Sequence, residues 1–156
     1  MVTAIAGTAG AEAGLAELRA RLACEDVVRA SFRLIDEGHA TQAAGLYTAD
    51  GSLTLSDATK QAGDVTLRGE DINHAMRHRE DEDRETVHVL SQSSFQLTDP
   101  EVAESECQLQ VYVLGDDRAE SAKPGSLSRV RDELVRGADG LWRISARRIT
   151  ILAGRR

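Results

Sequence analysis

The feature that most constrains this chain is a change in the spacing of its apolar residues at residue 86. Before it, apolar residues recur every three or four positions, which is typical of helices. After it, apolar and polar residues alternate, which is typical of strands. The alternating stretches are "TVHVLSQSSFQLTD", "VAESECQLQVYVLG", "RVRDELVRG" and "LWRISARRITIL". Helices followed by long strands form the α+β pattern, so we expect a strongly curved, mostly antiparallel sheet closed on one side by helices, a cone with a pocket inside.

Local signals place the boundaries of these elements. Residues 14–37 are predicted to be helical, with one apolar stripe over Leu15, Leu18 and Leu22 and a second over 27–35; the acidic residues of "CEDVV" could begin a new helix between them. Gly38 is suited to the left-handed position that ends a helix. A short helix is expected over 40–48, a turn at Asp50-Gly51, a strand over 52–56 and a helix over 69–80 that turns Ile72, Ala75 and Met76 inward. Hairpin turns are expected at Asp99-Pro100 and at "ADG", and the polar stretch 116–128 is expected to be an exposed loop.

Length and charge restrict the class of protein. At 156 residues the chain is expected to be one domain over 14–154, after a disordered leader over 1–13. A net charge of -7 argues against nucleic acid or an anionic membrane as partner, and no stretch matches a membrane span. Cys24 and Cys107 form neither a disulfide framework nor a zinc motif, so we expect the cytosol. Because phosphate loops, nucleophile elbows and dinucleotide fingerprints are missing, no cofactor is expected.

Two titratable residues stand out, each with an ordinary explanation. His88 lies within the apolar strand "TVHV", where a buried histidine is commonly hydrogen-bonded to a carbonyl. Asp36 lies in the last turn of a helix, where the helix dipole disfavours a carboxylate by roughly 0.3–1 kcal/mol. A solvated acid in "DEG" would explain Asp36 equally well. Taken singly, neither residue identifies a site.

The chain resembles the SnoaL-like branch of the nuclear transport factor 2-like superfamily. The resemblance rests on "VVRASFRLIDEGHATQAAGLYTADGSLTL", "TVHVLSQSSFQL" and "RVRDELVRGADGLWRISARRITIL", and covers roughly residues 18–152. It implies a cone-shaped α+β barrel that commonly forms homodimers through its sheet. It is less specific for activity, because the branch contains cyclases, dehydratases, isomerases and noncatalytic subunits.

The resemblance implies a pairing of Asp36 with His88. Dehydratases of the branch carry an Asp and a His at these positions, so Asp36 is expected to orient the ring and His88 to transfer protons. The resemblance also places Ser31, Phe32 and Leu55 in the pocket. Two departures matter: Ser31 stands where a tyrosine is common, and Leu55 falls where ketosteroid isomerase has its general base, which argues against isomerase chemistry of that kind.

Asp132 and Tyr112 each leave two interpretations open. Asp132 alternates with Val130 and Leu134. It is either a protonated pocket acid that donates a hydrogen bond to an oxyanion, as an aspartate of ketosteroid isomerase does, or an outward residue paired with an arginine. Tyr112 shares a face with Gln108 and Gln110. That face either lines the pocket or packs against a second subunit.

The remaining candidates favour structural roles. His74 and His78 are four apart on a helix, but a third metal ligand is missing, so no metal is expected. Trp142 is expected in the core or an interface, Tyr47 beneath the helices, and Arg147-Arg148 at a surface or interface unless one of them lines the pocket or binds an anion. We therefore expect a cofactor-independent lyase or isomerase, a cyclase or dehydratase, acting on a hydrophobic, oxygenated small molecule such as a polyketide intermediate. The alternative is a noncatalytic binding or accessory subunit with the same fold.

Overall fold

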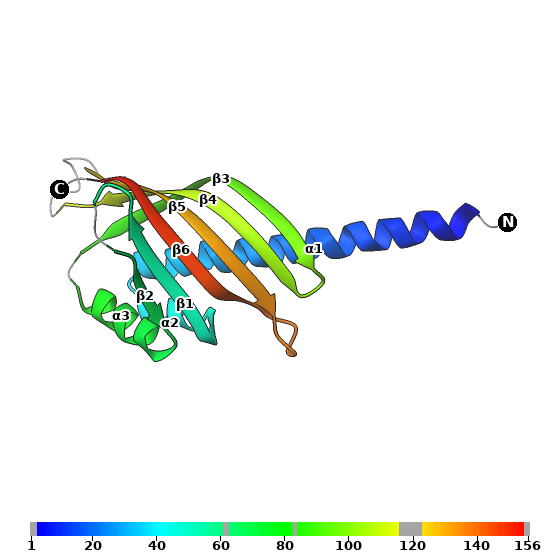
Figure 1. Ribbon diagram of the computed structural model, residues 1–156, viewed down its shortest axis with the longest axis horizontal. Coiled ribbons are helices and arrows are strands. Elements are labelled where there is room, and N and C mark those ends of the chain that lie inside the picture. The colour runs from blue at the N-terminus through cyan, green and yellow to red at the C-terminus, as the bar shows by residue number, and fades with distance from the viewer. Residues whose placement is uncertain (1–2, 61–62, 83, 116–122, 155–156) are drawn as a thin grey trace.

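The computed structural model describes residues 3–60, 63–82, 84–115 and 123–154 and shows three helices and six strands among them (Figure 1). In chain order these are α1 (Thr3–Asp36), α2 (Ala40–Ala44), β1 (Tyr47–Asp57), β2 (Val65–Arg68), α3 (Glu70–Asp81), β3 (Thr86–Asp99), β4 (Val102–Val113), β5 (Lys123–Arg136) and β6 (Trp142–Gly154). Side chains are described from residue 10 onward. The expected loop over 116–128 lies outside the described residues up to 122, and its remainder belongs to β5.

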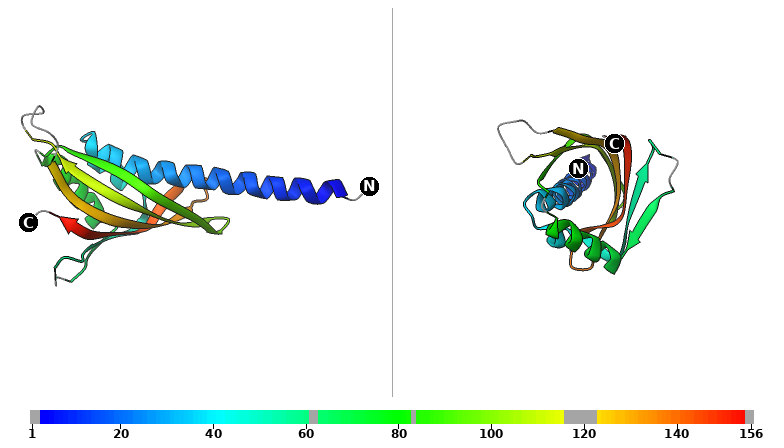
Figure 2. Two further views of the ribbon diagram at one scale, coloured as in Figure 1. Left: turned by 90° about the horizontal axis from the view of Figure 1, so that it is seen from above. Right: turned by 90° about the vertical axis from the view of Figure 1, so that its left-hand side faces the viewer.

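The strands form one sheet in the order β2-β1-β6-β5-β4-β3. Every pairing is antiparallel except β1 with β6, which is parallel. The sheet curls around the C-terminal half of α1, as the end-on view in Figure 2 shows. The expected α+β cone is confirmed.

Helix α1 is longer than the sequence pattern indicated. It begins at Thr3, so residues 3–13 of the expected disordered leader are helical, and it runs through "CEDVV" without a break. The alanines of this segment have the highest intrinsic helix propensity, which a pattern of apolar stripes does not register. The N-terminal half extends beyond the sheet (Figure 1), and Leu15, Leu18 and Leu22 are therefore exposed.

The C-terminal half of α1 supplies the helix side of the core. Cys24, Val28, Ser31 and Phe32 are all buried and lie on the face that the sheet covers. The helix ends as expected at Gly38, whose φ of 77° is in the left-handed region and whose N–H donates to the Ile35 carbonyl. Asp36 is thereby held in the last helical turn.

The connections differ from expectation in two places. The short helix α2 ends at Ala44, because Tyr47 already belongs to β1. Asp50-Gly51 lies inside β1, where the pairing with β6 shifts register between Tyr47 and Ser52, rather than in a turn between elements. The turns after Asp99 and at "ADG" occur where the sequence indicated, the latter with Gly140 at φ 79°.

The core lies between α1 and the concave face of the sheet. Leu53, Leu109, Val130, Leu134 and Ile144 are buried there, each less than a tenth exposed. Trp142 and Tyr47 belong to the same core, and α3 buries Ile72 and Met76 against it. None of the described helices combines the length and apolarity needed to cross a membrane.

Candidate functional site

The end of α1 and the edge strand β3 bring Asp36 and His88 together. An oxygen of Asp36, Oδ1, lies 2.5 Å from His88 Nδ1, and Oδ2 accepts a 2.8 Å hydrogen bond from the backbone N–H of the same histidine. The Thr86 hydroxyl donates to Oδ1 at 3.1 Å. The carboxylate therefore accepts hydrogen bonds from three groups of one strand. These donors offset the unfavourable position of an acid at a helix C-terminus.

The fold explains why this contact forms. Strand β3 lies at the edge of the sheet and pairs only with β4 among the described strands, so its other side faces the end of α1. Antiparallel strands leave alternate backbone groups pointing away from their neighbour, and the His88 N–H is one of these. Asp36 reaches it because Gly38 ends the helix two residues later.

The His88 ring lies against Phe32, with ring centroids 5.2 Å apart and planes tilted by 30°. Its side chain is 12% exposed. Because Nδ1 is directed at Asp36, Nε2 is the ring nitrogen available to a ligand. The pair borders an open depression of about 410 Å³ lined by Arg29, Phe32, Arg33, Asp36, His88, Val89 and Leu90.

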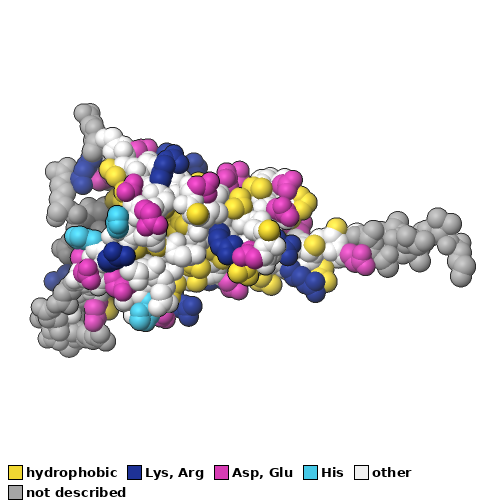
Figure 3. Space-filling model, turned by 90° about the horizontal axis from the view of Figure 1, so that it is seen from below, with side chains coloured by type: hydrophobic (Ala, Val, Ile, Leu, Met, Phe, Trp, Pro, Cys, Tyr) yellow, Lys and Arg dark blue, Asp and Glu magenta, His cyan; other side chains and the backbone are white. Residues whose placement is uncertain are grey.

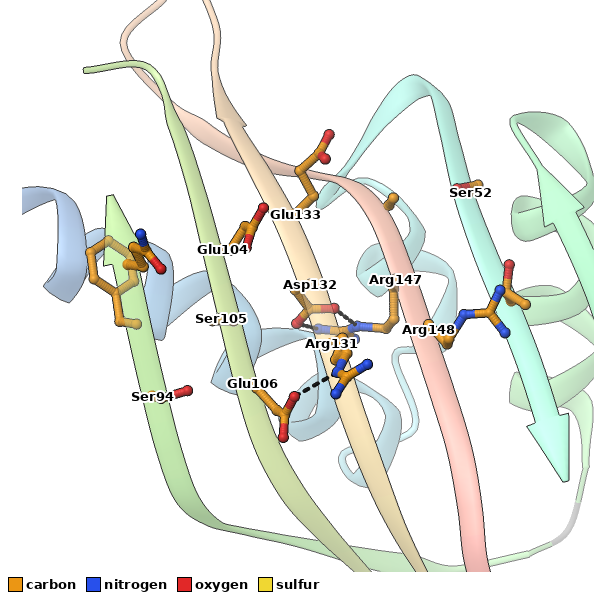
Figure 4. Close-up of a pocket in the computed structure, with 14 residues that line it drawn as sticks. Ser52, Ser94, Glu104, Ser105, Glu106, Arg131, Asp132, Glu133, Arg147 and Arg148 are labelled. Atoms are coloured by element: carbon orange, nitrogen blue, oxygen red, sulfur yellow. Dashed lines mark hydrogen bonds and ion pairs between the residues drawn. The ribbon is translucent and has the colours of Figure 1, made fainter. Parts of the chain in front are cut away.

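A second polar cluster lies inside the cone. Arg147 Nε and Nη2 donate to the two oxygens of Asp132 at 2.7 and 2.8 Å (Figure 4). Arg147 Nη1 donates to the Ser31 hydroxyl at 2.8 Å. The side chains of the ion pair are only 3% and 1% exposed. The Arg147 guanidinium also lies over the Phe32 ring at 4.6 Å, so Phe32 contacts both clusters.

The Asp132 carboxylate stabilises the positive charge of Arg147. Burial opposes the charge of Arg147, but the adjacent Asp132 carboxylate outweighs that effect and holds the pKa of Arg147 above its ordinary value. Burial raises the pKa of Tyr47, which lies next to the pair. Both oxygens of Asp132 act as acceptors from a guanidinium, so the role of a protonated oxyanion donor does not fit this geometry.

One of the two interpretations of the sequence placed Asp132 inward, but the sequence did not identify Arg147 as its partner. Asp132 faces inward, as its alternation with Val130 and Leu134 suggested, and it pairs with an arginine, as the competing interpretation required. The arginine was not identified, because a surface pair was favoured for Arg147-Arg148. Alternation in β6 was the available signal: Arg148 is exposed, whereas Arg147 shares the inward side and lies opposite Asp132 in the strand register.

The other expected pocket residues lie in different places. Phe32 borders the depression, whereas Ser31 is buried in the interior cluster. Leu55, which is 40% exposed, lies on β1 and does not border the depression. Tyr112 was wrongly placed in the pocket by one of its two interpretations: it lies opposite Val87 and Pro124 on the outer face of the sheet, with its hydroxyl 3.4 Å from Gln110 Oε1.

The outer face carries a wide, shallow groove of about 800 Å³ (Figure 4). Glu104, Glu106, Arg131 and Glu133 project from β4 and β5 along it, and Arg131 Nε contacts Glu106 at 2.5 Å. In the face shown in Figure 3, acidic and basic side chains are likewise interspersed rather than segregated by sign. The groove is polar and open, which is a poor environment for proton transfer on an apolar molecule.

Metal-ligating side chains do not gather in the described part of the chain, where no three of His, Cys, Asp and Glu are placed to hold an ion. His78 Nδ1 lies 3.4 Å from Glu82 on the exposed side of α3. The His74 and His78 pair therefore lies on a solvated helix face.

The fold and the Asp36–His88 site define a class that comparison with known proteins identifies. The family model described as "SnoaL-like domain" matches residues 16–148. The chain belongs to the SnoaL-like domain family. No curated protein sequence matches it significantly.

Solved structures share this fold at low identity. An NTF2-like protein with a cystatin-like fold from Novosphingobium aromaticivorans has a TM-score of 0.71 and 19% identity, over 99% of this chain and 92% of its own. ActVI-ORFA from Streptomyces coelicolor has a TM-score of 0.71 and 16% identity, over 85% and 96%. A protein from Catenulispora acidiphila in complex with S-DNPA has a TM-score of 0.69 and 19% identity, over 86% and 94%.

Proposed function

We propose that this protein is a cytosolic, cofactor-independent lyase or isomerase, a cyclase or dehydratase, that works by proton transfer at Asp36 and His88. The observation that carries the proposal is the 2.5 Å contact between Asp36 Oδ1 and His88 Nδ1 beside an open depression. A carboxylate on one ring nitrogen orients the ring and leaves the other nitrogen to exchange a proton, which is the arrangement that general acid–base catalysis uses.

In this mechanism His88 moves the proton and Asp36 stabilises the charge. Nε2 accepts a proton from a carbon next to a carbonyl, and the electron pair left behind forms a carbon–carbon double bond as a C–O bond breaks. The imidazolium then returns its proton to the departing hydroxyl, which leaves as water. Asp36 holds the ring oriented through Nδ1. No oxidant or reductant is consumed.

The substrate class is supported by the family and by the lining of the depression. Phe32, Val89 and Leu90 offer apolar surface beside the histidine. Among proteins of this fold, the one from Catenulispora acidiphila was solved in complex with S-DNPA. A hydrophobic, oxygenated small molecule such as a polyketide intermediate fits this lining and the family.

The test is turnover of candidate polyketide intermediates by His88→Ala and Asp36→Asn. Loss of a general acid–base is expected to lower kcat by about 10²–10⁴-fold for His88→Ala, with a smaller loss for Asp36→Asn, which keeps a hydrogen-bonding side chain. His74→Ala, on the exposed side of α3, is the matched control and should retain full activity. Unchanged turnover by a folded His88→Ala enzyme would refute the mechanism.

The competing function is a noncatalytic small-molecule binder or accessory subunit. The observation that favours it is that the depression is open, while the interior of the cone is occupied by the Asp132–Arg147 pair. A binder would show a ligand affinity that His88→Ala changes only modestly, with no product formed in the wild type.

We further infer that the outer sheet face joins two copies into a homodimer. Val87 is 39% exposed there, opposite Tyr112, and the groove of alternating charges lies on the same face. Analytical ultracentrifugation should give a dimer for the wild type and a weaker one for Arg131→Glu, which adds a fourth acid to a row that holds Glu104, Glu106 and Glu133. A monomer at all concentrations would contradict this inference.

A further inference from the structure

We propose that the depression beside His88 is a subsite for an organic anion, with Arg29 and Arg33 holding a carboxylate of the ligand. The substrate class would then be an amphipathic organic acid. The description of this ligand as a substrate rests on the proposed function, whereas the anion subsite itself does not.

The two arginines lie where a ligand at His88 would meet them. They are four residues apart on α1, which places them on neighbouring turns of one helix face, and both line the depression. The side chains of Arg29 and Arg33 are 59% and 66% exposed, so both are accessible to a ligand. Both lie on the face of α1 that carries Asp36, and both are closer than Asp36 to the N-terminus.

The existing partners of these arginines leave capacity for an anion. Arg33 meets Glu37 only at 4.0 Å, and Arg29 shares Glu25 at 2.9 Å and meets Asp26 at 3.8 Å. Exposed pairs of this kind contribute little and rearrange readily. A guanidinium has five N–H donors, so it can add a bidentate carboxylate without giving up a single-point contact.

Asp36, the acidic residue that lines the depression, is expected to repel a bound anion only weakly. Asp36 already accepts hydrogen bonds from His88 Nδ1, the His88 backbone N–H and the Thr86 hydroxyl. These three donors partly neutralise its charge, while the side chains of Arg29 and Arg33 are largely exposed. Arg29 and Arg33 are the basic side chains that line this depression, and Asp36 is the acidic one.

The apolar lining specifies the rest of the ligand. Phe32 is buried, Leu90 is partly buried and Val89 is 41% exposed, and all three line the depression together with the arginines and His88. A molecule with an apolar ring system and one carboxylate would place the ring on these side chains and the carboxylate on the guanidinium groups. The geometry thus favours an aromatic or polycyclic acid over a neutral ester.

The experiment compares 2-naphthoate with the neutral, equally shaped 2-naphthamide, using amide chemical-shift titrations of the isotope-labelled protein. We expect 2-naphthoate to shift the signals of Val89 and Leu90 and to bind about tenfold more tightly than 2-naphthamide at low salt. Raising the salt concentration should erase this difference. The double variant Arg29→Gln/Arg33→Gln should lose the preference, whereas Arg19→Gln, on an exposed part of the same helix, should keep it.

Equal affinity for the two probes, or shifts confined to residues away from the depression, would overturn the subsite. A loss of preference in Arg19→Gln as large as in the double variant would also overturn it, because only a general charge effect would remain. The probes are not turned over, so the outcome is independent of the catalytic proposal. If the preference holds while His88→Ala leaves turnover unchanged, the anion subsite stands and the acid–base mechanism fails.

Discussion

At the scale of single residues, the interior of the cone depends on one ion pair. Asp132 and Arg147 are buried with two short hydrogen bonds between them, and Ser31 satisfies a further guanidinium N–H. Removing charges from water is costly, and the pair is tolerated because each partner compensates the other. The pair also supports Phe32, on which the His88 ring rests.

We predict that Asp132→Asn lowers the free energy of unfolding by about 3–5 kcal/mol, because Arg147 would remain charged and buried without its partner. The double variant Asp132→Leu/Arg147→Met removes both charges and should be clearly more stable than the single variant. Urea denaturation followed by circular dichroism measures both. A single variant as stable as the wild type would show that water reaches the pair.

Sequence reasoning identified the Asp36–His88 contact but not the geometry around it. Both residues carried signals of their own, a costly helix end and a titratable ring in an apolar strand, and the family resemblance linked them. The backbone N–H of His88 as a partner of Asp36 had no signal, because every residue other than proline has such a group. The orientation of Tyr112 stayed open between two interpretations for a related reason: alternation defines two faces of a strand without saying which one is inside.

At the scale of elements, the position of the site depends on where α1 ends. Gly38 has a φ of 77°, and open space surrounds the position that a Cβ would occupy there. The end of the helix was predictable because glycine has no penalty in this conformation. The start was not, because neither an N-cap signal nor an apolar stripe marks residues 3–13.

We predict that Gly38→Ala lowers the free energy of unfolding by about 1–2 kcal/mol through backbone strain alone, since its methyl group would meet no neighbour. Gly38→Asn, which tolerates the left-handed region better, should lose less. Thermal or urea unfolding distinguishes them. Equal stability of the alanine variant and the wild type would mean that the helix end relaxes without cost.

At the scale of the whole molecule, the curvature of the sheet around α1 encloses both cysteines. Burial raises the pKa of Cys24 to about 12 and that of Cys107 to about 11, and the nearby Asp132 adds to the effect on Cys107. The overall cone was predictable from the order of helices and strands, because few architectures accept a run of long antiparallel strands after helices. The filling of its interior by charged side chains was not.

We predict that neither thiol reacts with a disulfide reagent at pH 8 until the whole domain unfolds, because reaction requires a thiolate. An Ala138→Cys variant, exposed in the hairpin between β5 and β6, should react at once and serves as the control. Since an exposed thiol has a pKa of about 9, the unfolded chain releases these protons first, and stability should fall as the pH rises above that value. Rapid labelling of the native wild type would contradict the prediction.

The hydrogen bond from the His88 backbone N–H to Asp36 has a further consequence for solubility. Strand β3 is an edge of the sheet, and an edge with free backbone donors is a template on which another chain can add a strand. Asp36 occupies one such donor and places a negative charge beside it. The carboxylate that contacts the histidine thus also lowers the tendency of this edge to pair with another chain. Asp36→Ala would leave the His88 N–H without this acceptor, so Asp36→Asn is the better test of the chemistry.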